Sequence, residues 1–182
     1  MLAIPSKLGG FISNNTLVVL AVDPEGENYL YGDDVSNGTQ VMDLKLPTSD
    51  FSQYTVCVSS LLNDDASRTA FLLGASAMVA VNVPTGTILW SKAIDTNGQP
   101  DNEIHSRNLV CEATGMMYLS DVSADGTPQV TALNSTADKL FTMQFPPINP
   151  VQPPDVVIGY PRWLYIRNVN TVTGIWGQRI PT

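Results

Sequence analysis

The sequence predicts an all-β fold, and three observations lead to that prediction. Helical periodicity is almost absent, because no long stretch keeps its apolar residues at three- and four-residue spacing. About a dozen short runs rich in Val, Ile, Leu, Tyr, Thr and Phe occur instead. Clusters of Gly, Pro, Asn and Asp lie between these runs, as turns lie between strands.

The predicted strands follow one another at short intervals along the chain. The first half holds those at residues 16–23, 28–34, 39–46, 54–62, 69–75, 78–83 and 87–94. The second half holds those at residues 107–113, 116–122, 129–134, 139–145 and 162–169. The segment from Phe145 to Pro161 carries six prolines, and we predict a stiff, extended connector there.

Composition excludes several classes of protein. Of the 182 residues, 43% are apolar and 14% are charged, which indicates a folded protein rather than a disordered one. The net charge is −8 and no basic run occurs, so we do not expect nucleic acid as a partner, because phosphate contacts require clustered Lys and Arg. No apolar run is long enough to span a membrane.

A longer repeat underlies the strand pattern. The stretch NVPTGTILW, from Asn82 to Trp90, contains a polar residue, a Thr-Gly turn and an apolar strand that ends on an aromatic. Weaker copies run from Asp34 to Met42, from Ala132 to Phe141 and from Asn170 to Trp176. We call the last residue of each copy its marker residue; the marker residues Met42, Trp90, Phe141 and Trp176 are 48, 51 and 35 residues apart. The two longer spacings match a four-stranded propeller blade, so the sequence predicts a β-propeller-like array of about four antiparallel, four-stranded blades.

Each part of the best copy has a physical explanation. Gly86 supplies the positive φ that a tight turn requires, and Pro84 presets φ within the turn. The side chain of Asn82 can bond to the turn backbone. Ala80 leaves room for the ring of Trp90, which we expect to pack against the neighbouring repeat and to help set how the repeats stack.

These residues carry a family resemblance. The pattern of Ala80, Asn82, Thr85, Gly86 and Trp90 resembles the tryptophan-docking motif of quinoprotein-like β-propellers, which are related to pyrroloquinoline-quinone dehydrogenases. The family has Asp where this chain has Asn82. The other copies match in part, through Asp34, Asn37 and Gly38, through Ala132, Asn134 and Phe141, and through Asn170, Thr173, Gly174 and Trp176.

The resemblance implies the family's scaffold rather than its dehydrogenase activity. The family's enzymes hold a quinone and calcium in a central channel, and many have a disulfide between adjacent cysteines. This chain has no adjacent cysteine pair and material for about four blades only. Its two cysteines, Cys57 and Cys111, fall on what would be the first strands of successive repeats, and we favour free thiols there over a disulfide.

We predict one domain over residues 1–182, a propeller or a propeller fragment, with repeats at about 16–46, 50–94, 104–145 and 155–180. Two alternatives stay open. Four blades could close on themselves as in haemopexin-type propellers, or the strands could form a β-sandwich.

Few residues point to chemistry. The loop after the best copy offers oxygen ligands, and its candidates for a metal, with calcium in view, are Asp95, Asn97, Asp101 and Glu103. A solvated loop explains them more simply, and we predict no catalytic residues and no cofactor. His105 is the only histidine and lies among polar residues, as a solvated loop histidine would.

The predicted function is that of a non-catalytic β-propeller scaffold or protein-interaction module, with a protein partner or additional blades, in some larger assembly. The alternative is a quinoprotein-like or glycan-active enzyme that uses a metal in the propeller channel. The compartment stays open, with an extracellular or lumenal location favoured over a cytoplasmic one. Glycosylation sequons occur at Asn14, Asn37 and Asn134, but chance alone would supply about two.

Overall fold

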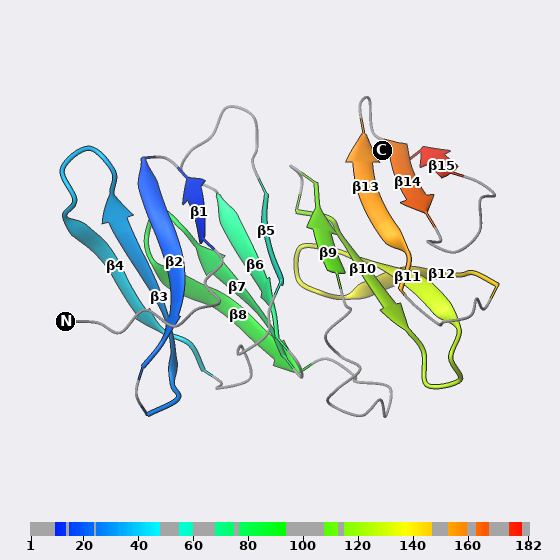
Figure 1. Cartoon of the computed structure of the whole chain (residues 1–182), viewed down its shortest axis with the longest axis horizontal. Coiled ribbons are helices and arrows are strands. Elements are labelled where there is room, and N and C mark those ends of the chain that lie inside the picture. Colours follow the sequence, from blue (N-terminus) through cyan, green and yellow to red (C-terminus); the bar gives the residue numbers. More distant parts are fainter. Residues whose placement is uncertain are drawn as a thin grey trace. The chain divides into compact units, whose positions relative to one another are not determined.

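A computed structural model of the chain describes residues 10–13, 15–23, 25–47, 55–59, 68–74, 77–93, 108–112, 115–146, 153–159, 163–167 and 175–179. The chain divides into two compact units, Met1–Ile94 and Asp95–Thr182 (Figure 1). We describe each unit by itself. The predicted single domain over the whole chain stays a prediction.

The N-terminal unit contains two four-stranded sheets, each an antiparallel meander. Sheet A consists of β1 (Gly10–Ser13), β2 (Thr16–Val22), β3 (Asn28–Asp34) and β4 (Gln40–Lys45). Sheet B consists of β5 (Thr55–Ser59), β6 (Thr69–Leu73), β7 (Ala77–Asn82) and β8 (Thr87–Ala93). Each strand pairs with the next in sequence, so β4 and β8 form sheet edges.

The C-terminal unit repeats this plan. Sheet C consists of β9 (Asn108–Cys111), β10 (Met117–Val122), β11 (Pro128–Leu133) and β12 (Lys139–Gln144). Sheet D has three described strands, β13 (Asp155–Gly159), β14 (Trp163–Arg167) and β15 (Ile175–Arg179). All described pairings are antiparallel, and the described residues contain no helix, which confirms the all-β prediction.

Two described strands, β1 and β13, were not among those predicted, whereas β15 falls on the last strand of the fourth predicted repeat. β1 lies in a short Gly-containing stretch and pairs with β2, and β15 holds the end of the fourth sequence copy. The prediction of a connector from Phe145 to Pro161 is wrong for residues 155–159, which form β13 and pair with β14. The sequence DVVIG follows the last of the clustered prolines, so each of its residues keeps the N–H group that a sheet needs.

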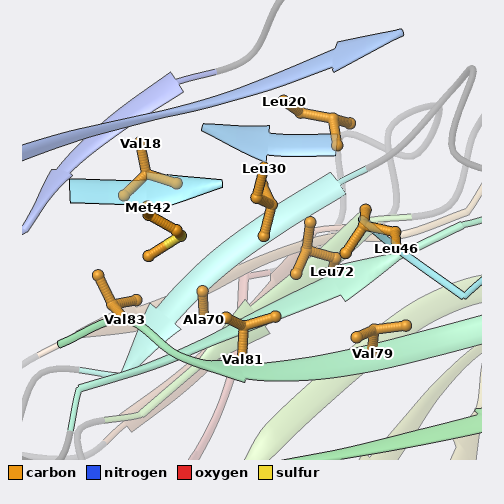
Figure 2. Packing of buried hydrophobic residues seen from close by; sticks show 10 residues of the cluster. All are labelled: Val18, Leu20, Leu30, Met42, Leu46, Ala70, Leu72, Val79, Val81 and Val83. Atoms are coloured by element: carbon orange, nitrogen blue, oxygen red, sulfur yellow. The ribbon is translucent and has the colours of Figure 1, made fainter. Parts of the chain in front are cut away.

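The core of the N-terminal unit lies between its two sheets (Figure 2). Sheet A contributes Val18, Leu20, Leu30 and Met42, and sheet B contributes Ala70, Leu72, Val79 and Val81; Leu46 and Val83 complete the cluster. We call the face of a sheet that packs on the following sheet its front face, and the opposite one its back face. Sheet A thus presents its front face to the back face of sheet B.

The C-terminal unit packs in the same order. Tyr118, Val130 and Ala132 of sheet C meet Val156, Leu164 and Ile166 of sheet D in one buried cluster. The hydroxyl of Ser120 on β10 donates a hydrogen bond to the carbonyl oxygen of Pro154, just before β13. Front-to-back packing of successive sheets is therefore common to both units.

The two hairpin turns that follow the second strands of sheets A and C are alike. The N–H of Gly26 donates to the carbonyl oxygen of Asp23 at 3.0 Å, and the N–H of Gly126 donates to that of Ser123 at 2.9 Å. Both glycines have positive φ, 86° and 81°. A repeated four-residue pattern with Gly in fourth place was thus present in the sequence as a further sign of equivalent repeats.

Leu30→Ala should destabilise the protein by about 2 to 5 kcal/mol, because Leu30 is buried at the centre of the core between sheets A and B. The free energy of unfolding in urea measures this effect. Val35→Ala is the control, since Val35 is exposed in the β3–β4 turn and its loss should change stability by no more than about 0.5 kcal/mol. Equal effects of the two changes would contradict the packing described above.

Candidate functional site

Three marker residues occupy the same position in their sheets. Met42 lies opposite Gly32, Trp90 opposite Ala80 and Phe141 opposite Ala132, in each case on the fourth strand facing the third. The second strand completes each row with a larger residue, so that the rows read Val18–Gly32–Met42, Phe71–Ala80–Trp90 and Tyr118–Ala132–Phe141. We call these the marker rows. A small residue between two large ones is their common feature.

A β-bulge follows each of the three marker rows. In sheet A, Gly32 pairs with Met42 but Asp33 pairs with Gln40, so Val41 is an extra residue without a partner on β3. The same register shift makes Leu89 the extra residue of β8 and Leu140 the extra residue of β12. Bulges bend a strand and re-aim its side chains, which lets the marker residue turn toward the front face.

Close approach explains why the middle residue of the first row is glycine. A Cβ atom at Gly32 would lie 2.9 Å from Cβ of Met42 and 3.0 Å from Cγ2 of Thr16, which is closer than carbon atoms can pack. Met42 also reaches sheet B, because a Cβ atom at Gly86 would lie 3.1 Å from Met42 Cγ. The marker residue of sheet A therefore lies against the β7–β8 turn of the next sheet.

The other two marker residues, Phe141 and Trp90, also lie beside large apolar side chains. Phe141 packs against the buried cluster between sheets C and D. Tyr118, in the same row, is buried and its hydroxyl donates to Oε1 of Glu112 at 2.9 Å, which satisfies the polar end of the ring. In sheet B the rings of Phe71 and Trp90 lie on either side of Ala80, with centroids 6.0 Å apart and planes at 37°.

Polar side chains close the turns next to the marker rows. Oδ1 of Asn82 accepts a hydrogen bond from the N–H of Thr85 at 3.1 Å, and the hydroxyls of Thr85 and Thr87 are 2.8 Å apart. Oδ1 of Asn134 accepts from the N–H groups of Thr136 and Asp138 at 3.0 and 2.8 Å.

One turn position takes a left-handed conformation in all three sheets. The residues there are Gly38, Gly86 and Ala137, with φ of 71°, 61° and 58°. Glycine adopts this conformation freely, whereas the alanine of the third turn must be held in it. The Asn134 side chain bonds around Ala137 on both sides, which accounts for an alanine being tolerated.

The fourth copy differs from the other three. Asn170, Thr173 and Gly174 lie outside the described residues. Trp176 is on β15 and pairs with Ile166, a branched residue of the core between sheets C and D, and the register there is unbroken. It therefore has neither the small neighbour nor the bulge that accompany the first three marker residues.

Hydrogen bonds lower the pKa of two carboxyl groups, those of Asp34 at the end of β3 and of Asp125 in the β10–β11 turn. At Asp34 the main cause is the hydroxyl of Ser36, which donates to Oδ1 at 2.6 Å. At Asp125 the main cause is the hydroxyl of Ser123, which donates to Oδ1 at 2.5 Å. Each bond favours the ionised form of its carboxyl group.

The structure does not test the predicted chemical sites. Asp95, Asn97, Asp101, Glu103 and His105 lie outside the described residues. Within the described part of the chain, no three His, Cys, Asp or Glu side chains come together as a metal site would require. Cys111 is a half-buried free thiol on β9, and Cys57 is on β5, so both lie on the first strand of a sheet as predicted.

Sequence reasoning missed the bulges and the residues that they expose. Val41, Leu89 and Leu140 each come directly before a marker residue, and they are 57%, 51% and 49% exposed. The sequence signal was an aliphatic residue before Met42, Trp90 and Phe141, but the extra residue in the register is visible only once the strands are paired.

No helix among the described residues has the length and apolar character needed to cross a membrane.

Comparisons identify the fold. Neither a family model nor a curated protein sequence matches the chain. Among solved structures, the WD40 domain of coronin from Toxoplasma gondii matches with a TM-score of 0.60 and 9% identity, over 88% of this chain and 39% of that one. The WD40 domain of SCAP from fission yeast matches with a TM-score of 0.42 and 11% identity, over 100% of this chain and 42% of that one.

The coronin match confirms the predicted fold class. The chain is an all-β protein with the propeller-like arrangement of antiparallel sheets that WD40 domains have. It spans about two fifths of the length of the WD40 chains that it matches. At 9% identity the likeness concerns fold alone, and neither match is to a quinoprotein.

Gly86→Ala should cost more stability than Gly38→Ala. Both glycines have positive φ in equivalent turns, which alone should cost about 1 to 2 kcal/mol for alanine. A Cβ atom at Gly38 meets nothing within 4 Å, whereas one at Gly86 lies 3.1 Å from Met42 Cγ. Urea unfolding of the two variants measures the difference. In a Met42→Ala background the difference should vanish, and its persistence there would show that Met42 is not the obstacle.

Ser36→Ala should raise the pKa of Asp34 toward its ordinary value and leave the pKa of Asp125 unchanged. Ser123→Ala should raise the pKa of Asp125 and leave the pKa of Asp34 unchanged. NMR titration of the carboxyl carbons measures both values. Because the folded-state pKa lies below the unfolded one, each bond stabilises the protein above the ordinary pKa and loses its effect as the pH falls through the lowered value. An unchanged Asp34 pKa in Ser36→Ala would contradict the assigned cause.

Proposed function

We propose that this chain is a non-catalytic β-propeller scaffold that binds a protein partner through its outer strands. The observation that supports this proposal is the repeated exposure of a large aliphatic residue at the bulge of three outer strands, β4, β8 and β12. We also propose that the resemblance to quinoprotein-like propellers concerns the scaffold and not the enzymatic activity.

The exposed residues are not needed for packing within the sheets. Val41, Leu89 and Leu140 are about half exposed, while the marker residues beside them point to the front faces. Single exposed aliphatic residues are common on protein surfaces. Here, however, an exposed aliphatic residue recurs at the same position of sheets A, B and C, because the repeat places it on the edge strand of each.

Protection of the sheet edge does not explain these residues. A bulge on an edge strand hinders pairing with foreign strands, and that function is served best by a charged residue. Here the bulge residue is Val or Leu in every case. Apolar side chains at the centre of a contact, ringed by polar ones, are what protein partners use for affinity.

The predicted docking residues complete the proposal. We infer that the marker rows of sheets A and C fix each of these sheets on the next sheet of its unit, with Gly32 or Ala132, the equivalents of Ala80, making room. The turn at Asn82, Thr85 and Gly86 receives the marker residue of sheet A. The position of Met42 against Gly86 supports this role. Within the N-terminal unit, the packing of sheet A on sheet B then holds the exposed bulge residues Val41 and Leu89 in place.

A variant with Val41→Ser, Leu89→Ser and Leu140→Ser tests the binding surface. Tagged chain is crosslinked in cells that produce it, and the bound proteins are quantified by mass spectrometry. A partner that binds the wild type should be recovered at least about tenfold less with the triple variant, which corresponds to about 1.4 kcal/mol of binding energy. Val35→Ser, which changes an equally exposed valine in the β3–β4 turn, should recover it fully.

Two results would contradict the proposal. Equal recovery of every partner by the triple variant would remove the bulge residues from the binding surface. A stoichiometric calcium ion or the absorbance of a bound quinone in the purified chain would favour the enzyme alternative, with ligands from the loop of Asp95, Asn97, Asp101 and Glu103.

A further inference from the structure

The back face of sheet A carries a stacked pair of tyrosines. Val18, Leu20 and Leu30 lie on the front face, in the core with sheet B. Side chains alternate along a strand, so Tyr29 and Tyr31 of β3 point to the back face. Their rings stack with centroids 5.7 Å apart and planes at 9°, and both residues are half-buried. Part of this aromatic pair is therefore open to a ligand.

Carboxyl groups border the pair. Asp43 lies opposite Tyr31 on β4, and Asp33 is the next residue of β3 on the same face. Both aspartates are exposed. Burial raises the pKa of Tyr31, and the negative charge of Asp43 raises it further, so this carboxylate acts on the tyrosine hydroxyl. The surroundings of Tyr31 are thus both aromatic and negatively charged.

Positive charge on this sheet is already balanced. Lys45 is the only lysine or arginine on the described strands of sheet A, and its Nζ is 3.4 Å from Oε2 of Glu27. The carboxylates of Asp33 and Asp43 therefore have no other lysine or arginine of these strands to pair with.

A further sheet is not a suitable partner for this face. By register, Tyr31 and Asp33 correspond to Val79 and Val81 of sheet B. Val79 and Val81 are 0% exposed, because sheet A packs on them. A sheet packed in the same way on the back face of sheet A would bury the carboxylate of Asp33, which is costly without a cation beside it. The charge of this face calls for a partner that brings positive charge.

We propose that the back face of sheet A binds an arginine-bearing segment of a protein partner, with one guanidinium group against Tyr31 and between the carboxylates of Asp33 and Asp43. A guanidinium group is planar, stacks on aromatic rings and pairs with carboxylates through a fixed fork of N–H donors, whereas a lysine ammonium group has neither the plane nor the fork. Leu17 lies opposite Asp33 and is 37% exposed, so it offers an apolar surface to the methylene groups of that arginine.

This inference goes beyond the proposed scaffold function, because it concerns a face of sheet A, whereas the bulge residues lie on edge strands. The net charge of −8 adds a long-range attraction for a basic segment, and added salt should weaken binding.

The probe is a capped peptide of alternating glycine and arginine, and its control has lysine in place of arginine. Each peptide is titrated into the full chain in about 0.15 M salt, where charges more than about 8 Å apart are largely screened. NMR follows the ring resonances of Tyr29 and Tyr31. The arginine peptide should shift both with a saturable curve and bind at least about twofold more tightly than the lysine peptide.

Two pairs of variants locate the contact. Asp33→Asn should weaken binding of the arginine peptide about threefold, whereas Glu25→Gln, which removes one negative charge from the exposed β2–β3 turn of the same unit, should leave it almost unchanged. Tyr31→Leu should weaken binding about threefold, whereas Tyr31→Phe keeps the ring and should bind as the wild type does. Urea unfolding shows that each variant is folded.

Three results would overturn the proposal. They are tyrosine rings that the arginine peptide does not shift, equal affinity for the lysine peptide, and equal effects of Asp33→Asn and Glu25→Gln. The variant with Val41→Ser, Leu89→Ser and Leu140→Ser should bind the peptide as the wild type does, so failure of this inference is distinguishable from failure of the scaffold function.

Discussion

The fit of a large marker residue against a small residue on the neighbouring strand is the constraint on which the stacking of sheets depends. Met42 can lie on the front face of sheet A only because Gly32 has no Cβ atom. The adjacent bulge turns the marker residue toward the next sheet. The β7–β8 turn receives it with another glycine, Gly86. Backbone geometry and side-chain volume thus fix the spacing of two sheets together.

This constraint falls on volume more than on chemical type. The marker residue changes from Met42 to Trp90 to Phe141, while its neighbour on the third strand stays glycine or alanine. Close-packed cores tolerate a change of apolar side chain when the total volume is kept, but they do not tolerate an added atom where the backbones are already close. The small residue is therefore the more restricted member of the pair, although the large marker residue is the more conspicuous one in the sequence.

Sequence patterns predicted most strands and the repeat. They did not predict β13, nor the bulges, which depend on how the strands pair. Alternating apolar runs identified the strands that hold the marker rows, and the spacing of the marker residues indicated the blades. β13 was missed because prolines before Asp155 dominate the local composition. The bulges at Val41, Leu89 and Leu140 were missed because an extra residue is defined only relative to the partner strand.

The bulge affects two surfaces of a sheet, the face that packs on the next sheet and the exposed edge strand. In sheets A and C it sends the marker residue into the packing against the next sheet, and in sheets A, B and C it leaves the preceding aliphatic residue exposed at the sheet edge. A partner bound at the edge strands would then contact Val41 or Leu89 without competing for the faces that the sheets use to stack. Separation of the two surfaces matters for a scaffold, because a partner that needed the stacking faces could bind only by taking the sheets apart.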